Sequence, residues 1–199
     1  MAAIFFDLDG TLLEFDRAYS SILSAAFRSV GGESRRAWVD GYSEAFFEAF
    51  EACEPEPYRR AFDAIDVAHE TELLVEALQN QEVSACQPSP DVHSALDRLA
   101  GEFELGVVTN GVPDWQREKL RAYDLEERFD VIVASYAAGA HKPDPAPFRL
   151  AEQRLPTEKY TMVGDDDADI AGANAVGWSS IRYTGGGFAT IAEELLAER

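Results

Sequence analysis

Residues 4–11 of the chain read IFFDLDGT, an apolar run that ends in two carboxylates and a turn. Asp7 and Asp9 stand two residues apart at the end of the expected strand, so their side chains project to the same side. Gly10 and Thr11 then turn the chain away and leave both acids at the strand's tip. Such a pair can divide labour, with one acid attacking and the other moving a proton. Because Asp-Gly also marks ordinary turns, the chemical interpretation depends on residues downstream.

A regular alternation of strand and helix patterns begins near residue 88. Short apolar runs predict strands, and the patterns between them predict helices. The expected strands are residues 3–7, 104–109, 129–134, 160–164 and 179–183. The expected helices are residues 91–100, 113–123, 145–154 and 168–176. The sequence therefore predicts an α/β fold built on a parallel sheet of at least five strands with right-handed crossovers.

The segment between the first strand and this alternation reads largely as helix, with no convincing strand. Trp38, Tyr42, Phe46 and Phe50 recur every four residues, which is typical of one face of an amphipathic helix. Such an aromatic stripe can bind bases or sugars, but packing against neighbouring helices is the commoner use. The expected domains are a core of residues 1–14 and 87–199 and a helical insertion of residues 15–86.

The composition is that of a globular protein. The chain has 199 residues, of which 46% are hydrophobic, enough for one core and a small accessory domain. No apolar run approaches the roughly 20 residues that a membrane span needs, and the N-terminus lacks the positive region of a signal peptide. Cys53 and Cys86 have no metal-ligand spacing. We therefore expect a cytoplasmic protein with reduced thiols.

The formal net charge is −20 at pH 7, and only three lysines occur, at positions 119, 142 and 159. A charge this negative repels nucleic-acid backbones and anionic membranes. We therefore expect neither a nucleic acid polymer nor a membrane as a partner. The acids are spread along the chain without forming a like-charge tail. A cationic partner is one interpretation, and we favour the other, a strongly hydrated surface suited to high salt, as in halophilic proteins.

Two arginine pairs lie within the helical segment, at residues 35–36 and 59–60. They could meet a second anionic group of a ligand. Because acids surround them in the sequence, we expect them to pair with neighbouring carboxylates.

Further polar residues follow the predicted strands, at the edge where open parallel sheets bind ligands. Thr109 and Asn110 offer a hydroxyl and an amide that can bind phosphate oxygens, although TNG also suits a plain turn. Lys142 lies in HKPDP, where prolines stiffen the loop and can hold the ammonium in place. A lysine in this loop of a lysine-poor chain is a candidate ligand-binding group. His141 is more often a loop or core residue than a catalyst, and we leave it out of the chemistry.

The acidic segment 164–169, GDDDAD, follows another predicted strand. Clustered carboxylates suit a hard cation such as Mg²⁺, which prefers oxygen ligands. The alternative is an acidic helix N-terminus, which the helix dipole favours. Both can hold at once, with Asp165 on the metal and Asp167 or Asp169 supporting the helix.

Convergence of these acids in one cleft would require compensating charge. Asp7, Asp9 and Asp165 would repel one another, as would Asp166 if it joins them, and some would take up protons. A divalent cation and Lys142 supply the positive charge that such a site needs. The same cation lets a phosphate dianion enter a carboxylate-rich cleft.

Taken together, these motifs resemble those of the haloacid dehalogenase superfamily of phosphotransferases. The matching positions are, in chain order, Asp7 to Thr11, then Thr109, Lys142, and Gly164-Asp165 with Asp169. The match runs over nearly the whole chain. The helical insertion is similar to the cap of the helical-cap subgroup, and FFDLDGTLLEFD and VVTNGVPDWQREKL look like its nucleotidase and small-metabolite phosphatase members. The resemblance implies a Rossmann-like core with an inserted helical cap.

The resemblance also implies a role for each matching residue. Asp7 would attack phosphorus and carry an aspartyl-phosphate. Asp9 would protonate the leaving alcohol and later activate water. Thr109 and Lys142 would hold the transferring phosphoryl group, with Asn110 nearby.

The implied metal ligands for Mg²⁺ are the Asp7 carboxylate, the Asp9 backbone carbonyl and Asp165. The chain departs from the family pattern beyond this point. Asp166 stands where many relatives carry a small hydroxyl residue, and the spacing from Asp165 to Asp169 is one residue shorter than in many helical-cap members. Whether Asp166 or Asp169 supports the metal is left open by the sequence.

The expected activity is Mg²⁺-dependent hydrolysis of a small phosphorylated metabolite or nucleotide, and three alternatives remain. A 2-haloacid dehalogenase would use Asp7 on carbon, without a metal or an acid at position 9. A sugar-phosphate mutase would keep the whole motif set. A non-catalytic phosphate or Mg²⁺ sensor would have no use for a full set of catalytic groups, and none is missing.

The surface charge predicts that salt stabilises the fold. Self-repulsion among the carboxylates should destabilise the protein in dilute buffer, and screening should relieve it. The thermal midpoint should therefore rise as KCl increases from low to multimolar concentration. A flat or falling midpoint over this range would show that the charge is not an adaptation to salt.

Overall fold

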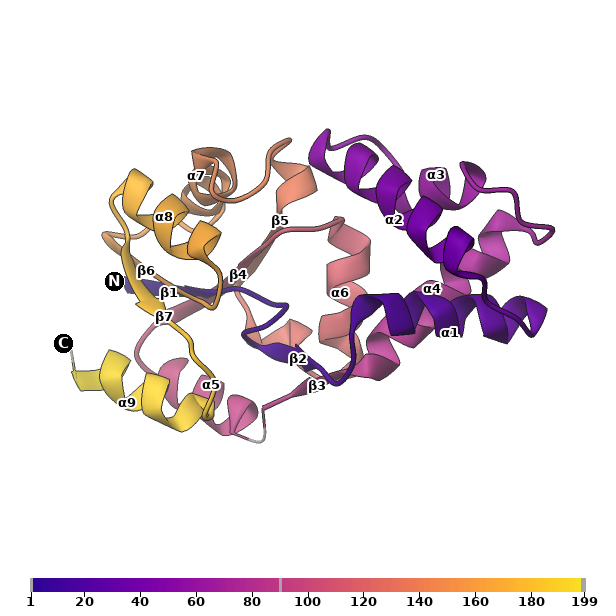
Figure 1. Ribbon diagram of the computed structural model, residues 1–199. Helices are drawn as coiled ribbons and strands as arrows, with labels where there is room; N and C mark the ends of the chain where they lie inside the picture. Colours follow the sequence, from indigo (N-terminus) through magenta and orange to yellow (C-terminus); the bar gives the residue numbers. More distant parts are fainter. Residues whose placement is uncertain (1, 90, 198–199) are drawn as a thin grey trace. The chain divides into compact units, whose positions relative to one another are not determined.

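The chain forms two compact units in the computed structural model, which describes residues 2–89 and 91–197. The first unit consists of Met1–Glu14 and Gln87–Arg199, and the second is Phe15–Cys86. Figure 1 shows a sheet with surrounding helices in the first unit and helices in the second. No helix among the described residues is both long enough and apolar enough to span a membrane.

Five parallel strands form the sheet of the first unit, in the order β5-β4-β1-β6-β7. Their bounds are β1 Ala2–Phe6, β4 Glu104–Thr109, β5 Val131–Ala134, β6 Lys159–Gly164 and β7 Ser179–Arg182. All five strands expected from the sequence are present. The predicted α/β, Rossmann-like fold is confirmed.

Strand β1 lies at the centre of the sheet, and its register aligns the strand ends. Phe6, the last residue of β1, is level with Val107 of β4 and Val163 of β6. Because the strands are parallel, the residues that follow β1, β4 and β6 emerge at one edge. This edge is where the motifs predicted to carry the chemistry are found.

Helices cover both faces of this sheet. They are α5 Val92–Leu99, α6 Pro113–Ala122, α7 Pro145–Arg154, α8 Asp167–Val176 and α9 Phe188–Ala197. In Figure 1, α7 and α8 lie on one face, and α5 and α9 lie on the other. The first four were predicted, and α9 was not. The start of α7 is fixed by local interactions. The side chain of Asp144 accepts a hydrogen bond from the Ala146 amide, and Pro145 occupies the first helical position.

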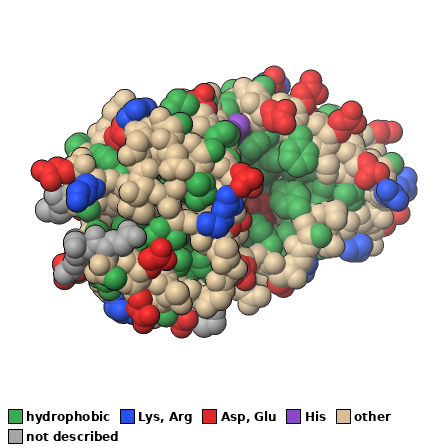
Figure 2. Space-filling model, turned by 60° about the vertical axis from the view of Figure 1, so that its left-hand side comes forward, with side chains coloured by type: hydrophobic (Ala, Val, Ile, Leu, Met, Phe, Trp, Pro, Cys, Tyr) green, Lys and Arg blue, Asp and Glu red, His purple; other side chains and the backbone are tan. Residues whose placement is uncertain are grey.

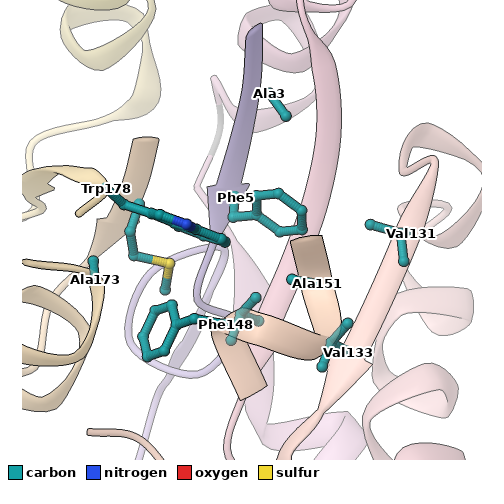
Figure 3. Packing of buried hydrophobic residues seen from close by; sticks show 10 residues of the cluster. Ala3, Phe5, Val131, Val133, Phe148, Ala151, Ala173 and Trp178 are labelled. Atoms are coloured by element: carbon teal, nitrogen blue, oxygen red, sulfur yellow. The ribbon is translucent and has the colours of Figure 1, made fainter. Parts of the chain in front are cut away.

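The core beneath α7 and α8 is built on alternate residues of β1 (Figure 3). Phe5 faces this layer, and its ring centroid lies 5.0 Å from that of Trp178. Phe148 of α7 meets the same tryptophan edge-on at 5.3 Å. Phe6 points to the opposite face, where its ring lies 5.9 Å from that of Phe188 in α9. Because β1 is buried on both faces, its apolar run is nearly continuous.

The second unit contains four helices, α1 Tyr19–Gly31, α2 Arg36–Glu51, α3 Pro57–Asp63 and α4 Thr71–Ala85. The aromatic stripe lies on α2, as predicted. Its rings pack within the unit: Tyr42 contacts Phe62 at a centroid distance of 4.4 Å, and Phe46 contacts Tyr58 at 5.0 Å. The stripe is therefore largely a packing surface of the helical unit.

Two short strands that the sequence analysis did not predict stand at the two boundaries of the segment 15–86, with only Phe15 and Cys86 inside it. They are β2 Leu13–Phe15 and β3 Cys86–Pro88, which pair with each other in a two-stranded sheet. Each has three residues, too few to produce a readable alternation in the sequence.

The arginine pairs bind neighbouring carboxylates, as expected. The ion pairs are Arg35–Glu33, Arg36–Asp40, Arg59–Glu72 and Arg60–Glu54. Acidic side chains are scattered over the face seen in Figure 2 and do not gather in one patch. This distribution agrees with a generally hydrated surface, and the halophilic character stays a prediction.

Gly106 of β4 provides a test of the core. A Cβ at this position would lie 2.3 Å from the ring of Phe5, its partner on β1. Gly106→Ala should therefore lower the free energy of unfolding by about 1–3 kcal/mol, because a well-packed core resists added volume. Gly101→Ala is the matched control, since the nearest atom to its Cβ would lie 3.6 Å away. Equal urea midpoints for the two variants would contradict this packing.

Candidate active site

A cavity of about 220 Å³ opens at the carboxyl ends of the parallel strands. It is lined by Asp7, Asp9, Thr109, Asn110, Lys142, Asp165, Asp166, Ala168 and Asp169. All six residues predicted for the site line this cavity. Parallel strands bring them together, since each residue lies at the end of a strand or in the segment that follows it.

Asp7 is the first residue after β1 and is held in the sheet edge by its backbone. Its amide donates a hydrogen bond to the Val163 carbonyl at 2.9 Å, and only 7% of the residue is exposed. Burial raises the pKa of Asp7 to about 6, and nearby Asp169 and Asp9 add to this rise, while Lys142 opposes it. The carboxylate is therefore desolvated at the floor of the cavity.

Lys142 places a buried ammonium beside Asp7. Its Nζ donates to Asp7 Oδ1 at 2.7 Å, to Asp169 Oδ1 at 2.5 Å and to the Val108 carbonyl at 2.9 Å. Although burial lowers it, the two carboxylates raise the pKa of Lys142 above its usual value, so the group stays charged. The interpretation that this lysine is not a solubilising residue is supported by its geometry.

Asn110 fixes the loop that carries Lys142. Its Oδ1 accepts from the Lys142 amide at 2.8 Å, and its Nδ2 donates to the Lys142 carbonyl at 3.3 Å. The side chain therefore acts on the lysine backbone in this structure. Direct contact of Asn110 with a substrate stays a prediction.

Asp9 is held by two residues of α6 that the sequence interpretation missed. Lys119 Nζ donates to both carboxylate oxygens, at 2.6 Å to Oδ1 and 2.7 Å to Oδ2. Gln116 Nε2 donates to Asp9 Oδ2 at 2.9 Å and to Thr109 Oγ1 at 2.9 Å. The sequence contains one indication of Lys119: it is one of only three lysines, as is Lys142.

Asp165 is positioned by the turn that follows Asp9. Thr11 Oγ1 donates to Asp165 Oδ1 at 2.7 Å. Gly10 has a φ of +92°, which favours glycine, and a Cβ there would lie 2.4 Å from Asp165 Oδ2. The Asp-Gly-Thr turn is therefore shaped both by its backbone conformation and by the close approach of the Asp165 carboxylate.

Asp166 and Asp169, which the sequence left as alternatives, have different surroundings. Asp166 begins α8: its side chain accepts from the Ala168 amide at 2.8 Å, while Asp169 Oδ2 accepts from the Asp166 amide at 3.1 Å. This capping box satisfies the first turn of the helix. Asp169 is also fully buried against Lys142. The helix start is therefore supported by Asp166 and Asp169, and Asp167 is not part of this box.

Three carboxylates form a candidate donor set for a hard cation. Oxygen atoms of Asp7, Asp165 and Asp169 lie within 4.8 Å of one another. Both oxygens of Asp169 already accept hydrogen bonds. Among the described residues, no hydrogen bond reaches Oδ2 of Asp7 or of Asp165. These two carboxylates therefore fit Mg²⁺, which prefers oxygen ligands, and Asp169 fits the role of orienting Lys142.

The family of the chain follows from comparison with known proteins. A family model described as haloacid dehalogenase-like hydrolase matches residues 1–177. The chain belongs to this family. It is 32% identical over 159 residues to a phosphoserine phosphatase of Thermus thermophilus, a match that covers 78% of this chain and 59% of that relative. It is 28% identical over 183 residues to the pyrimidine 5′-nucleotidase YjjG of Escherichia coli, covering 85% and 80%.

Solved structures agree with this assignment. A HAD phosphatase from Thermococcus onnurineus is similar with a TM-score of 0.68 and 26% identity, covering 94% of this chain and 88% of that one. A 2-haloacid dehalogenase from Pseudomonas syringae gives a TM-score of 0.73 at 23% identity over the whole of both chains. The second likeness concerns the fold alone. Because the family model matches and the relatives are phosphatases, the chain is a hydrolase of the HAD phosphatase kind.

The raised pKa of Asp7 predicts a pH-dependent cost of folding in the metal-free protein. Because the folded value of about 6 lies above the ordinary 3.8, the contribution of Asp7 is most favourable below pH 4 and is lost as the pH rises through 6. In EDTA, the thermal midpoint of the wild type should therefore fall relative to Asp7→Asn between pH 5 and pH 8, on the order of 5 °C.

Asp167→Asn is the matched control for this measurement, since the Asp167 side chain is 97% exposed. Its midpoint should stay parallel to that of the wild type over the same range. A difference between wild type and Asp7→Asn that does not vary with pH would contradict the desolvation of Asp7.

Proposed function

We propose that the protein is a cytoplasmic, Mg²⁺-dependent phosphomonoester hydrolase that acts on a small phosphorylated metabolite or nucleotide through an aspartyl-phosphate. The observation that carries the proposal is the placement of two carboxylates, Asp7 and Asp9, in one cavity with the ammonium of Lys142. Phosphoryl transfer needs a nucleophile, a proton carrier and positive charge around the phosphoryl oxygens.

In the first half of the reaction, a carboxylate oxygen of Asp7 attacks phosphorus. The bond from phosphorus to the ester oxygen breaks as the new bond to Asp7 forms. The departing alkoxide takes a proton from the Asp9 carboxylic acid, which becomes a carboxylate. Lys142 holds Asp7 in place through its 2.7 Å contact and offers positive charge to the transferring group.

In the second half, the Asp9 carboxylate accepts a proton from water, and the water oxygen attacks phosphorus. The bond between phosphorus and Asp7 breaks, which releases orthophosphate and restores both side chains. One acid–base group therefore serves both steps and typically contributes about 10²–10⁴-fold to the rate. Thr109, buried at the cavity wall, would bind a phosphoryl oxygen.

Asp7 and Asp165, together with the Asp9 backbone carbonyl, would hold Mg²⁺. When bound, the cation neutralises charge on the phosphoryl oxygens and allows a dianion to enter the cavity. The charges of the residues are consistent with this. Asp7 and Asp169 are paired with the ammonium of Lys142 and Asp9 with that of Lys119, whereas no lysine is paired with Asp165 among the described residues. Negative charge therefore exceeds positive charge around the cavity, which a divalent cation would offset.

The helical unit Phe15–Cys86 is proposed to act as the cap, the part that recognises the remainder of the substrate. The names of the relatives point to small phosphorylated compounds, phosphoserine in one case and pyrimidine nucleotides in another. The dehalogenase alternative is disfavoured because a leaving halide needs no proton, which gives Asp9 no task.

Hydrolysis of p-nitrophenyl phosphate and of a panel of phosphorylated metabolites tests the proposal. EDTA should abolish hydrolysis, Mg²⁺ should restore it, and Asp7→Asn should remove both turnover and any acid-stable phosphate on the protein. Assays at low and at multimolar KCl cover the expected salt dependence.

Two results would contradict the proposal. Full hydrolysis by the chelated protein would show that no metal is needed. Release of halide from 2-chloropropionate without metal would favour the dehalogenase. Product analysis on sugar phosphates separates a hydrolase, which frees orthophosphate, from a mutase, which returns an isomeric ester.

A further inference from the structure

A buried lysine of helix α6, Lys119, contacts the carboxylate of Asp9. Lys119 lies on α6, and its side chain is 2% exposed, whereas that of Asp9 is 29% exposed. The Nζ atom lies 2.6 and 2.7 Å from the two oxygens of Asp9. The two residues are 110 positions apart in the chain.

Burial of this lysine needs an explanation. An ion pair that buries an ammonium is a weak means of stabilisation, because the desolvation of that charge offsets the attraction. The neighbouring helical positions Glu118 and Arg121 are solvent-exposed and form their ion pairs at the surface. The pair is better explained by its effect on Asp9. Because Lys119 donates to both oxygens, it fixes the orientation of the Asp9 carboxylate.

Gln116 restrains the same carboxylate from one turn earlier in α6. Its Nε2 lies 2.9 Å from Asp9 Oδ2, 2.9 Å from Thr109 Oγ1 and 3.0 Å from the Asn110 carbonyl. Gly111 makes room for it, because a Cβ there would lie 2.8 Å from the Gln116 amide. The acid–base carboxylate and the Thr109 hydroxyl are therefore tied to one side chain.

The pattern of donors distinguishes the two oxygens of Asp9. A carboxylate has about four acceptor sites, two on each oxygen. Lys119 and Gln116 both donate to Oδ2, while Oδ1 receives only the Lys119 bond among the described residues. Oδ1 therefore keeps an acceptor site for a proton.

We propose that Lys119 and Gln116 are positioning residues that hold Asp9 with Oδ1 as the atom that exchanges the proton with the leaving alcohol and with water. This inference rests on the proposed phosphatase function. Proton transfer requires the carrier to lie within hydrogen-bond reach of the reacting oxygen. A displacement of about 1 Å can cost on the order of 10²-fold in rate.

The test compares kcat/KM for Lys119→Met and wild type in Mg²⁺ on two esters, p-nitrophenyl phosphate and an alkyl phosphate. Nitrophenolate is a good leaving group without protonation, whereas an alkoxide must be protonated as it leaves. The variant should lose about 10²-fold on the alkyl phosphate and several-fold less on the nitrophenyl ester. In an Asp9→Asn background, Lys119→Met should cause little further loss, because the group it positions has been disabled.

Two further variants complete the design. Lys159→Met makes the same substitution at an exposed lysine of the same unit and should retain wild-type kcat/KM on both esters. Gln116→Met keeps Lys119 and removes one donor to Asp9, together with the contacts to Thr109 and the Asn110 carbonyl. Its loss should be smaller and should again be greater on the alkyl phosphate. It also carries the test if Lys119→Met does not fold, as judged by circular dichroism.

The outcomes separate the two proposals. Equal losses on both esters, or losses that add to those of Asp9→Asn, would show a purely structural role and overturn the inference while leaving the phosphatase function intact. Unchanged kcat/KM in a folded variant would overturn it as well. Absence of hydrolysis by the wild type with Mg²⁺ on the full panel would contradict the proposed function, and the inference with it.

Discussion

The buried ammonium of Lys142 is the interaction on which the rest of the site depends. It joins the end of β1, through Asp7, to the start of α8, through Asp169, and it also reaches the Val108 carbonyl of β4. Three elements that are distant in the sequence therefore share one cation. Without it, two desolvated carboxylates would face each other in a medium where like charges repel strongly. Asn110 in turn fixes the backbone of this lysine from the β4 loop.

Each of the two acids at the tip of β1 has an ammonium of its own. Asp7 is paired with Lys142 at the floor of the cavity, and Asp9 is paired with Lys119 nearer the opening. The environments differ, because Asp7 is far more buried than Asp9. Different surroundings are how two chemically identical side chains acquire different tasks. In this chain, the difference is produced by a single short turn that leaves one acid in the sheet edge and directs the other towards α6.

The fold alone does not identify the reaction, because a dehalogenase and a phosphatase share it with this chain at comparable TM-scores. The residues around Asp9 bear on the choice between the two reactions. A halide leaves without a proton, so a network of Lys119, Gln116 and Thr109 around Asp9 has no purpose in dehalogenation. The same network is useful where an alcohol must be protonated and a water deprotonated in turn.

The sequence by itself determined the parallel sheet, because alternating strand and helix patterns leave few topologies open. It also identified the residues that line the cavity, since residues that follow parallel strands must emerge at one edge. Only the tertiary structure shows how the surroundings of Asp166 and Asp169 differ, because both are acids near a helix start and packing alone turns Asp169 inward to Lys142. It also revealed Lys119 and Gln116, whose contact with Asp9 depends on how α6 is rotated against the sheet. That rotation is set by the burial of the whole helix face, which no local pattern around a single residue encodes.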